Sequence, residues 1–255
     1  MTPLSSLKLM EVDRIRLHEC HEATRLEETC RRIRDDGEVK NPIIALPLSE
    51  GGCLVLDGAH RFASLLRLGC RKAPVQLVDP KDVVLKAWSH LVSRGEWLDR
   101  LRSDPKLSWT THPPEGVRGI RWMTGEGSSG WIVPSERNPS LKEELEVWHR
   151  VVLSYSIAGP VRRLRANGET SLPEGSVLFE HPSLSVHQLR RLGEAGEMLP
   201  AGVTRFTVRG RLLNLGVPLS WLYGEGPGES EWEAQCRRWE DRMRLYTESV
   251  YLCEA

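Results

Sequence analysis

The stretch VLDGAHRFASLLRLG, residues 55–69, decides how the fold is read. An apolar run ends abruptly at Asp57-Gly58, and apolar residues then recur at a helical spacing until Gly69. Apolar residues spaced by three or four positions predict a helix, and a glycine just beyond the last turn is a common helix stop. We therefore expect a strand at 53–57 that turns sharply into a helix at 59–68.

The flanking sequence predicts more strands and helices in an α+β chain. We expect strands at 7–15, 41–48, 73–79, 176–180 and within 203–215, and helices at 22–36, 81–94, 140–156, 184–195 and about 229–247. The strands at 41–48 and 53–57 flank a Ser-Glu-Gly-Gly turn and predict a hairpin. Proline and glycine concentrate at 108–119 and 124–140, which indicates a domain boundary or a long functional loop.

Composition narrows the class of protein. The 255 residues carry 35 basic and 35 acidic side chains, and this zero net charge argues against duplex DNA as the main partner. The six cysteines show no Cys-x-x-Cys pair and no zinc-ligand spacing. There is no apolar leader or membrane-length apolar run, so we expect a cytoplasmic protein with reduced thiols and no membrane partner.

Residues 57–61 suit an anion. A helix N-terminus offers unpaired N–H groups, Gly58 allows close approach, and His60 and Arg61 add cationic donors. Asp57 would repel a bare phosphate unless a cation such as Mg²⁺ lies between them. The alternative is structural: Asp57 caps the helix and the basic pair is solvated. No Gly-Lys pair is present, so there is no Walker A loop.

The segment LHECHEATRLEE, residues 17–28, places acids and histidines just before a predicted helix. A carboxylate held near a phosphate can act as general base for an attacking hydroxyl. We assign that role to Glu19, with His18 orienting it. Glu22 is interpreted as a complement to the helix dipole and His21 as an exposed histidine.

The order of LHE, DGEVKNPIIA, LVLDGAHRFASLLRLG and APVQLVD resembles the ParB/sulfiredoxin superfamily. The Asp-Gly-x-His-Arg motif with the upstream Leu-His-Glu is similar to its free L-serine kinases. The resemblance extends to the siderophore-associated branch (staphyloferrin B type), which makes O-phospho-L-serine for 2,3-diaminopropionate synthesis. It is strong over about 7–95 and weaker at 109–111 and 200–222.

This resemblance implies roles for matching positions. Glu19 would take the proton of the serine hydroxyl, and Asp57 would lie beside the transferred phosphoryl group and Mg²⁺, with ATP or ADP as donor. The other implied contacts are Asn41, Pro42, Gly58, Ala59, His60 and Arg61 for nucleotide and phosphate, and His18, Trp88, Thr204 and Arg205 for substrate. Ala59 replaces a histidine common in the family, and Phe206 stands where a polar residue is expected.

The resemblance also implies two domains. Residues 1–105 would form a ParB/sulfiredoxin-like nucleotide-binding catalytic domain, and 106–255 would close the substrate cleft. The cation for the serine carboxylate stays open among Arg205, Arg209 and Arg211. Trp232 and Trp239 share one face of the last predicted helix, which permits a homodimer.

Three other functions compete. One is a non-catalytic nucleotide-binding regulator, which would not need Glu19. Another is a ParB-like DNA-binding protein, which the neutral charge disfavours. A sulfiredoxin-like repair enzyme would need a reactive cysteine in 57–62, and none is present.

Overall fold

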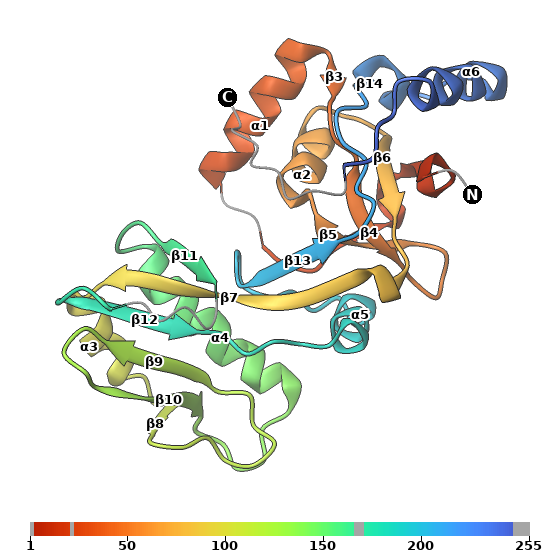
Figure 1. Cartoon of the computed structure of the whole chain (residues 1–255). Helices are drawn as coiled ribbons and strands as arrows, with labels where there is room; N and C mark the ends of the chain where they lie inside the picture. The colour runs from red at the N-terminus through yellow and green to blue at the C-terminus, as the bar shows by residue number, and fades with distance from the viewer. Residues whose placement is uncertain (1–2, 21–22, 166–170, 247–255) are drawn as a thin grey trace.

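The computed structural model describes residues 3–20, 23–165 and 171–246 and arranges them around two main β-sheets (Figure 1). The strands of the first sheet are β1 (Leu7–Glu11), β2 (Ile15–Leu17), β4 (Ile43–Pro47), β5 (Cys53–Asp57) and β6 (Lys72–Leu77). Those of the second are β7 (Val83–Ser93), β8 (Leu107–Thr110), β9 (Ile120–Thr124), β10 (Ser129–Pro134), β11 (Arg162–Arg165), β12 (Ser176–Glu180) and β13 (Thr204–Val208). A small ladder joins β3 (Glu38–Val39) to β14 (Val217–Pro218).

The helices are α1 (Ala23–Asp36), α2 (Ala59–Arg67), α3 (Glu96–Arg102), α4 (Leu141–Ser156), α5 (Val186–Glu194) and α6 (Glu229–Glu240). Short 3₁₀-helices cover Pro3–Ser6, Val12–Arg14, Pro80–Asp82 and Leu219–Leu222. This mixture confirms the α+β class.

The first sheet has the order β1-β6-β4-β5-β2 and is apolar on both faces. In β4, Ile43 and Ala45 point into one core with α1 and α2, while Ile44 and Leu46 point into the other core with α5 and the second sheet. Alternate residues of a strand face opposite sides, so the continuous apolar run of β4 fits a strand buried on both faces. The predicted hairpin of β4 and β5 is confirmed.

The second sheet is organised around β7. Its first half pairs with β13, and its second half pairs with β11 on one edge and β12 on the other. Figure 1 shows β7 running from beneath the first sheet along the lower part of the molecule. This strand therefore connects the second sheet to the first one.

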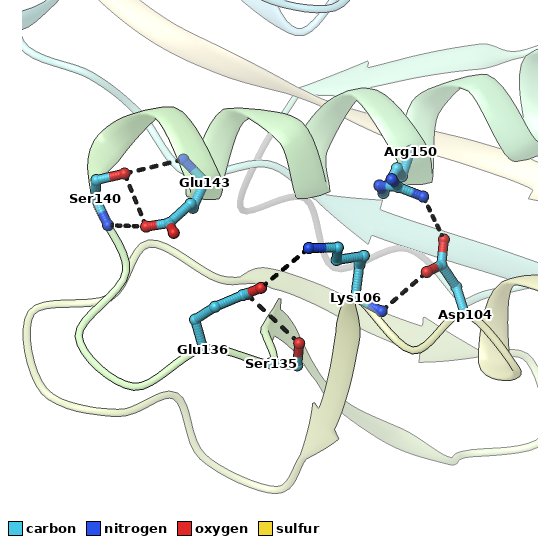
Figure 2. Close-up of polar contacts among 7 residues, drawn as sticks. All are labelled: Asp104, Lys106, Ser135, Glu136, Ser140, Glu143 and Arg150. Carbon is cyan, nitrogen blue, oxygen red and sulfur yellow. Dashed lines mark hydrogen bonds and ion pairs between the residues drawn. The ribbon is translucent and has the colours of Figure 1, made fainter.

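Polar contacts cap helix α4 at its start and join it to the segment after α3 (Figure 2). Ser140 and Glu143 form a capping box, which satisfies donors that the first turn leaves open. Further along, Arg150 donates to Asp104 at 2.9 Å, just after α3. The contact between Arg150 and Asp104 joins α4 to the segment after α3, beside the sheet.

The chain then returns to the first sheet. Leu212, Val217 and Leu222 are buried in the core that contains α1 and α2, and Trp239 of α6 joins them. Trp232 packs between Trp221 and Trp239, at 6.2 Å and 5.8 Å between ring centroids. The face of α6 that holds Trp232 and Trp239 therefore contributes to the core of its own chain, and the homodimer stays a prediction.

Several predicted elements need correction. The segment expected as a helix at 81–94 forms the strand β7 over Val83–Ser93, in which 89–92 are buried consecutively between β11 and β12. A strand enclosed on both sides loses the alternation that would identify it. The segments 108–119 and 124–140, expected as a boundary or a long loop, contain most of β8 and all of β10, and Gly125 and Gly127 lie in the turn between β9 and β10.

Other boundaries shift. The strand expected at 7–15 ends at Glu11, and in 203–215 only β13 is a strand, since 209–216 wraps over the first sheet. Helix α6 ends at Glu240. The predicted domain boundary near residue 105 stays a prediction, although the change from the first sheet to the second occurs between Leu77 and Val83.

Candidate active site

A cleft of about 900 Å³ lies where the first sheet, α1 and α2 meet β7, β11 and β13. It is lined by ten of the twelve residues to which the resemblance gave a catalytic, nucleotide or substrate role: Glu19, Asn41, Asp57, Gly58, Ala59, His60, Arg61, Trp88, Thr204 and Arg205. The other two lie beside it, because His18 is buried behind Glu19 and the carbonyl of Pro42 accepts from Arg61 at 3.3 Å. Of the upstream cluster, His21 and Glu22 lie outside the described residues.

One side of the cleft, called the phosphate side after its predicted role, is built from the end of β5 and the start of α2. Gly58 has φ +103°, a left-handed conformation that disfavours any side chain, and α2 begins at Ala59. The first-turn N–H groups and the positive end of the helix dipole lie on the wall of the cleft. Since Asp57 is not the N-cap, the reading of this acid as a simple cap is wrong.

Asp57 lies between two arginines. It forms an ion pair with Arg211, and Arg61 lies 3.8 Å away. Two guanidinium groups and one carboxylate leave this side cationic, which suits an anion. Arg211 therefore belongs with the phosphate side, not with the serine carboxylate for which it was one candidate.

Asn41 helps to fix the segment after β13 that borders the phosphate side. Its side-chain oxygen accepts from the backbone N–H of Asn214 at 2.8 Å. This bond ties the segment after β13, which carries Arg211, to the start of β4. Asn41 thereby lines the cleft and also anchors the segment that carries Arg211.

The opposite side is the hydroxyl side, built around Glu19. One carboxylate oxygen accepts from the Thr204 hydroxyl at 2.8 Å and from the backbone N–H of Gly202 at 3.3 Å. Burial alone would raise the pKa of Glu19, but His18, Thr204 and the charge of Arg163 together hold that pKa below its usual value. At neutral pH Glu19 is therefore an ionised proton acceptor.

His18 explains how this carboxylate is held. Its Nδ1–H donates to the carbonyl of Val55, and its Nε2 lies 2.8 Å from the Thr204 hydroxyl. A hydroxyl can donate one hydrogen bond and accept others, so Thr204 links the ring of His18 to the Glu19 carboxylate. The Nε2 atom itself lies 3.6 Å from that carboxylate.

Aromatic side chains border the hydroxyl side. The guanidinium of Arg205 lies 5.1 Å from the centre of the Trp88 ring, a cation–π contact. Phe206 packs edge-on against His18 at 5.1 Å, which fills the position where a polar residue was expected. Arg209 is exposed on the far end of β13, where its N–H donates to Asp82, and it does not line the cleft.

A buried network that the sequence did not reveal supports the backbone here. His90 Nε2–H donates to the carbonyl of Gly202 at 2.8 Å, and Tyr155 O–H donates to His90 Nδ1 at 2.6 Å. His181 Nδ1–H donates to the carbonyl of Trp88 at 3.2 Å. Because carbonyls only accept, they fix the tautomer of both rings. The network holds the backbone of two residues that line the cleft.

The protonation states of this network follow from its burial. Burial raises the pKa of Tyr155 well above its ordinary value, so the phenol keeps its proton. Burial, followed by the charge of His90, lowers the pKa of His181 to about 3, so this imidazole is neutral. Lone histidines on strands carry no local signature, and only the tertiary fold brings these residues together.

The carboxylates of the cleft determine whether a divalent cation could bind there. Within the described ranges, no group of three or more His, Cys, Asp or Glu side chains could hold a metal by itself. Mg²⁺, however, usually takes one or two carboxylates together with substrate phosphates and water. Asp57 at a phosphate-suited helix N-terminus fits that second mode.

The comparisons with known proteins bear on this geometry. No family model matches the chain. The sequence is 35% identical to the ATP-dependent L-serine kinase SbnI of Staphylococcus aureus over 255 residues, which covers 97% of each protein. The chain belongs to the ATP-dependent L-serine kinase family.

Two solved structures agree with this membership. SbnI with a C-terminal truncation has a TM-score of 0.78 and 33% identity, over 94% of this chain and 96% of that one. A free serine kinase in complex with AMP has a TM-score of 0.70 at 20% identity, over 85% and 93%, and shows the shared fold. Within the described part of the chain, no helix combines the length and apolar character needed to cross a bilayer.

Proposed function

We propose that this kinase transfers the γ-phosphoryl group of ATP to the hydroxyl of L-serine, giving O-phospho-L-serine and ADP. The observation that carries the proposal is a single cleft with a proton acceptor on one side and an anion-binding helix start on the other. The nucleotide and serine named for the relatives supply the identity of the two substrates. ATP is the donor that the relatives indicate, where the sequence had left ATP or ADP open.

Glu19 is the general base. Its carboxylate is ionised, partly buried and fixed by Thr204 and Gly202, so it can accept the proton of a serine hydroxyl without rearrangement. The serine oxygen then forms the new bond to the γ-phosphorus, and the bond from that phosphorus to the β-phosphate oxygen breaks. ADP leaves with the bonding electron pair.

The phosphate side supplies positioning and positive charge, which phosphoryl transfer needs more than covalent chemistry. The N–H groups of Gly58 and Ala59, with His60 and Arg61, are the proposed phosphate donors. Arg211 joins them by position, since it pairs with Asp57. Asn41 and Pro42 line the nucleotide side.

Asp57 is the proposed carboxylate for Mg²⁺. The cation, when bound, neutralises the charge that develops on the transferred group and the leaving oxygen. Asp57 has two arginines beside it in this structure, so holding the cation would require it to give up its pair with Arg211. Trp88, Thr204 and Arg205, backed by His18, border the serine.

The wider setting is proposed on the resemblance. A ParB/sulfiredoxin-like first domain would bind the nucleotide and the second would close over serine. The product would feed 2,3-diaminopropionate or siderophore-type biosynthesis. The described cysteines are all free thiols, which supports a cytoplasmic location.

The test is ³¹P NMR of the protein with Mg²⁺, L-serine and ATP, run beside Glu19→Gln. We expect a phosphomonoester signal of O-phosphoserine that forms about 10²- to 10⁴-fold more slowly in the variant. Glu28→Gln is the matched control, because Glu28 also lines the cleft but pairs with Arg32 at 3.0 Å. No signal from the parent chain, or equal rates in parent and Glu19→Gln, would overturn the proposal.

A further inference from the structure

The serine kinase reaction needs a cation that recognises the carboxylate of the substrate, and the sequence left three arginines as candidates. The structure removes two, because Arg211 pairs with Asp57 and Arg209 lies outside the cleft. Serine is small, so a cation that binds its carboxylate must lie close to the base that receives its hydroxyl proton.

Arg163 of β11 meets this requirement. It lines the cleft, and its guanidinium lies directly over Gly202, so close that a Cβ at position 202 would be 2.2 Å from it. Gly202 in turn donates its N–H to Glu19. Glycine, here at φ +74°, thus allows a guanidinium and a carboxylate to lie on two sides of one peptide.

The strand explains how Arg163 reaches this place. Strand β11 pairs with β7 in a register that sets Arg163 opposite His90, whose ring holds the carbonyl of Gly202. Neighbouring residues of a strand point to opposite faces, so Arg162 points away from the face that Arg163 presents to the cleft. Arg162 is therefore a natural control on the same strand.

Several other cations of the cleft have contacts away from Glu19. Arg61 reaches Asp57 and Pro42, while Arg32 and Lys40 pair with Glu28 and Asp36 on the outer wall. Arg205 lies over the ring of Trp88. The charge of Arg163, by contrast, acts on Glu19 itself and contributes to its low pKa.

We infer that Arg163 binds the α-carboxylate of L-serine and sets the enzyme's preference for an amino acid over a neutral alcohol. This inference rests on the proposed function. A planar guanidinium matches a carboxylate through two parallel hydrogen bonds. With the carboxylate held there, the hydroxyl points to Glu19 and away from Arg163.

The experiment compares L-serine with L-serinamide, which keeps the hydroxyl and lacks the carboxylate. For Arg163→Gln, we expect kcat/KM for L-serine to fall about ten- to a hundredfold, the loss of one charge-assisted contact. We expect kcat/KM for L-serinamide and the KM for ATP to stay unchanged. Arg163→Lys restores part of the loss, and Arg162→Gln matches the parent.

Two kinetic results would overturn the inference. If kcat/KM falls equally for L-serine and L-serinamide in Arg163→Gln, the Arg163 side chain has only a structural role. If Arg205→Gln, not Arg163→Gln, removes the preference for L-serine, the carboxylate is bound over Trp88.

Calorimetric titration of L-serine with a non-hydrolysable ATP analogue separates this inference from the function itself. Binding that depends on Arg163 without any phosphoserine formation overturns only the proposed function. Absence of L-serine binding to the parent chain overturns the inference.

Discussion

The two sides of the cleft are built in different ways. The phosphate side comes mainly from one continuous segment, the end of β5 and the first turn of α2, with contributions from residues 41–42 and from Arg211. The hydroxyl side brings Glu19 together with Arg163, Gly202 and Thr204, which lie far away along the chain. Anion binding thus depends on local geometry, whereas the proton acceptor depends on the correct docking of the second sheet onto the first.

After Glu19→Gln, the largest effect is expected on the phosphate side, from Asp57→Asn. The change removes the proposed Mg²⁺ ligand, so kcat/KM for ATP should fall on the order of 10²-fold, and more Mg²⁺ should be needed for half-maximal rate. The measurement is the rate of O-phosphoserine formation over a Mg²⁺ titration. Asp36→Asn is the control, since Asp36 lines the outer wall and pairs with Lys40 at 2.8 Å. An unchanged Mg²⁺ requirement in Asp57→Asn would show that Asp57 serves only the two arginines.

The hydroxyl side is tested by Thr204→Val, which keeps the shape of the side chain. The Thr204 hydroxyl helps to hold the pKa of Glu19 below its ordinary value, so its removal raises that pKa. Because Glu19 acts in its ionised form, the rate falls as pH drops through this pKa, and the acid limb of the pH–rate profile should move to higher pH. We also expect kcat to fall about tenfold, by the loss of one hydrogen bond to a charged group.

The control for that experiment lies on the same strand. Thr207 is exposed on β13, and Thr207→Val should leave both the profile and kcat unchanged. If the acid limb of Thr204→Val stays in place, Glu19 does not depend on Thr204. The two sides of the cleft would then differ less than the structure indicates.

This difference also explains what the sequence could predict. The turn at Gly58, the helix of α2 and the β4–β5 hairpin follow from local patterns, and the structure confirms them. Glu19 was proposed as a base from the acids and histidines before a predicted helix, whereas Thr204 was found through the family resemblance, because nothing in their own segments shows that they meet. No sequence pattern pointed to Arg163 or His90. Arg163 lies on β11, for which no strand was predicted, and His90 lies on β7, which was predicted as a helix.

The smallest effect is expected from Tyr155→Phe, which tests whether the support behind the hydroxyl side matters for catalysis. Tyr155 stacks on Phe179 at 5.2 Å, so phenylalanine keeps the packing and removes only the hydroxyl, which contacts His90 at 2.6 Å and His181 at 3.4 Å. His90 in turn holds the carbonyl of Gly202, whose N–H holds Glu19. We expect kcat to fall a few-fold with the KM for ATP unchanged, and the free energy of unfolding to fall by about 1–3 kcal/mol. Chemical denaturation and steady-state kinetics measure both, with the exposed Tyr223→Phe as control. A loss of stability with no change in kcat would separate the network from the site, and the hydroxyl side would then depend on its own contacts alone.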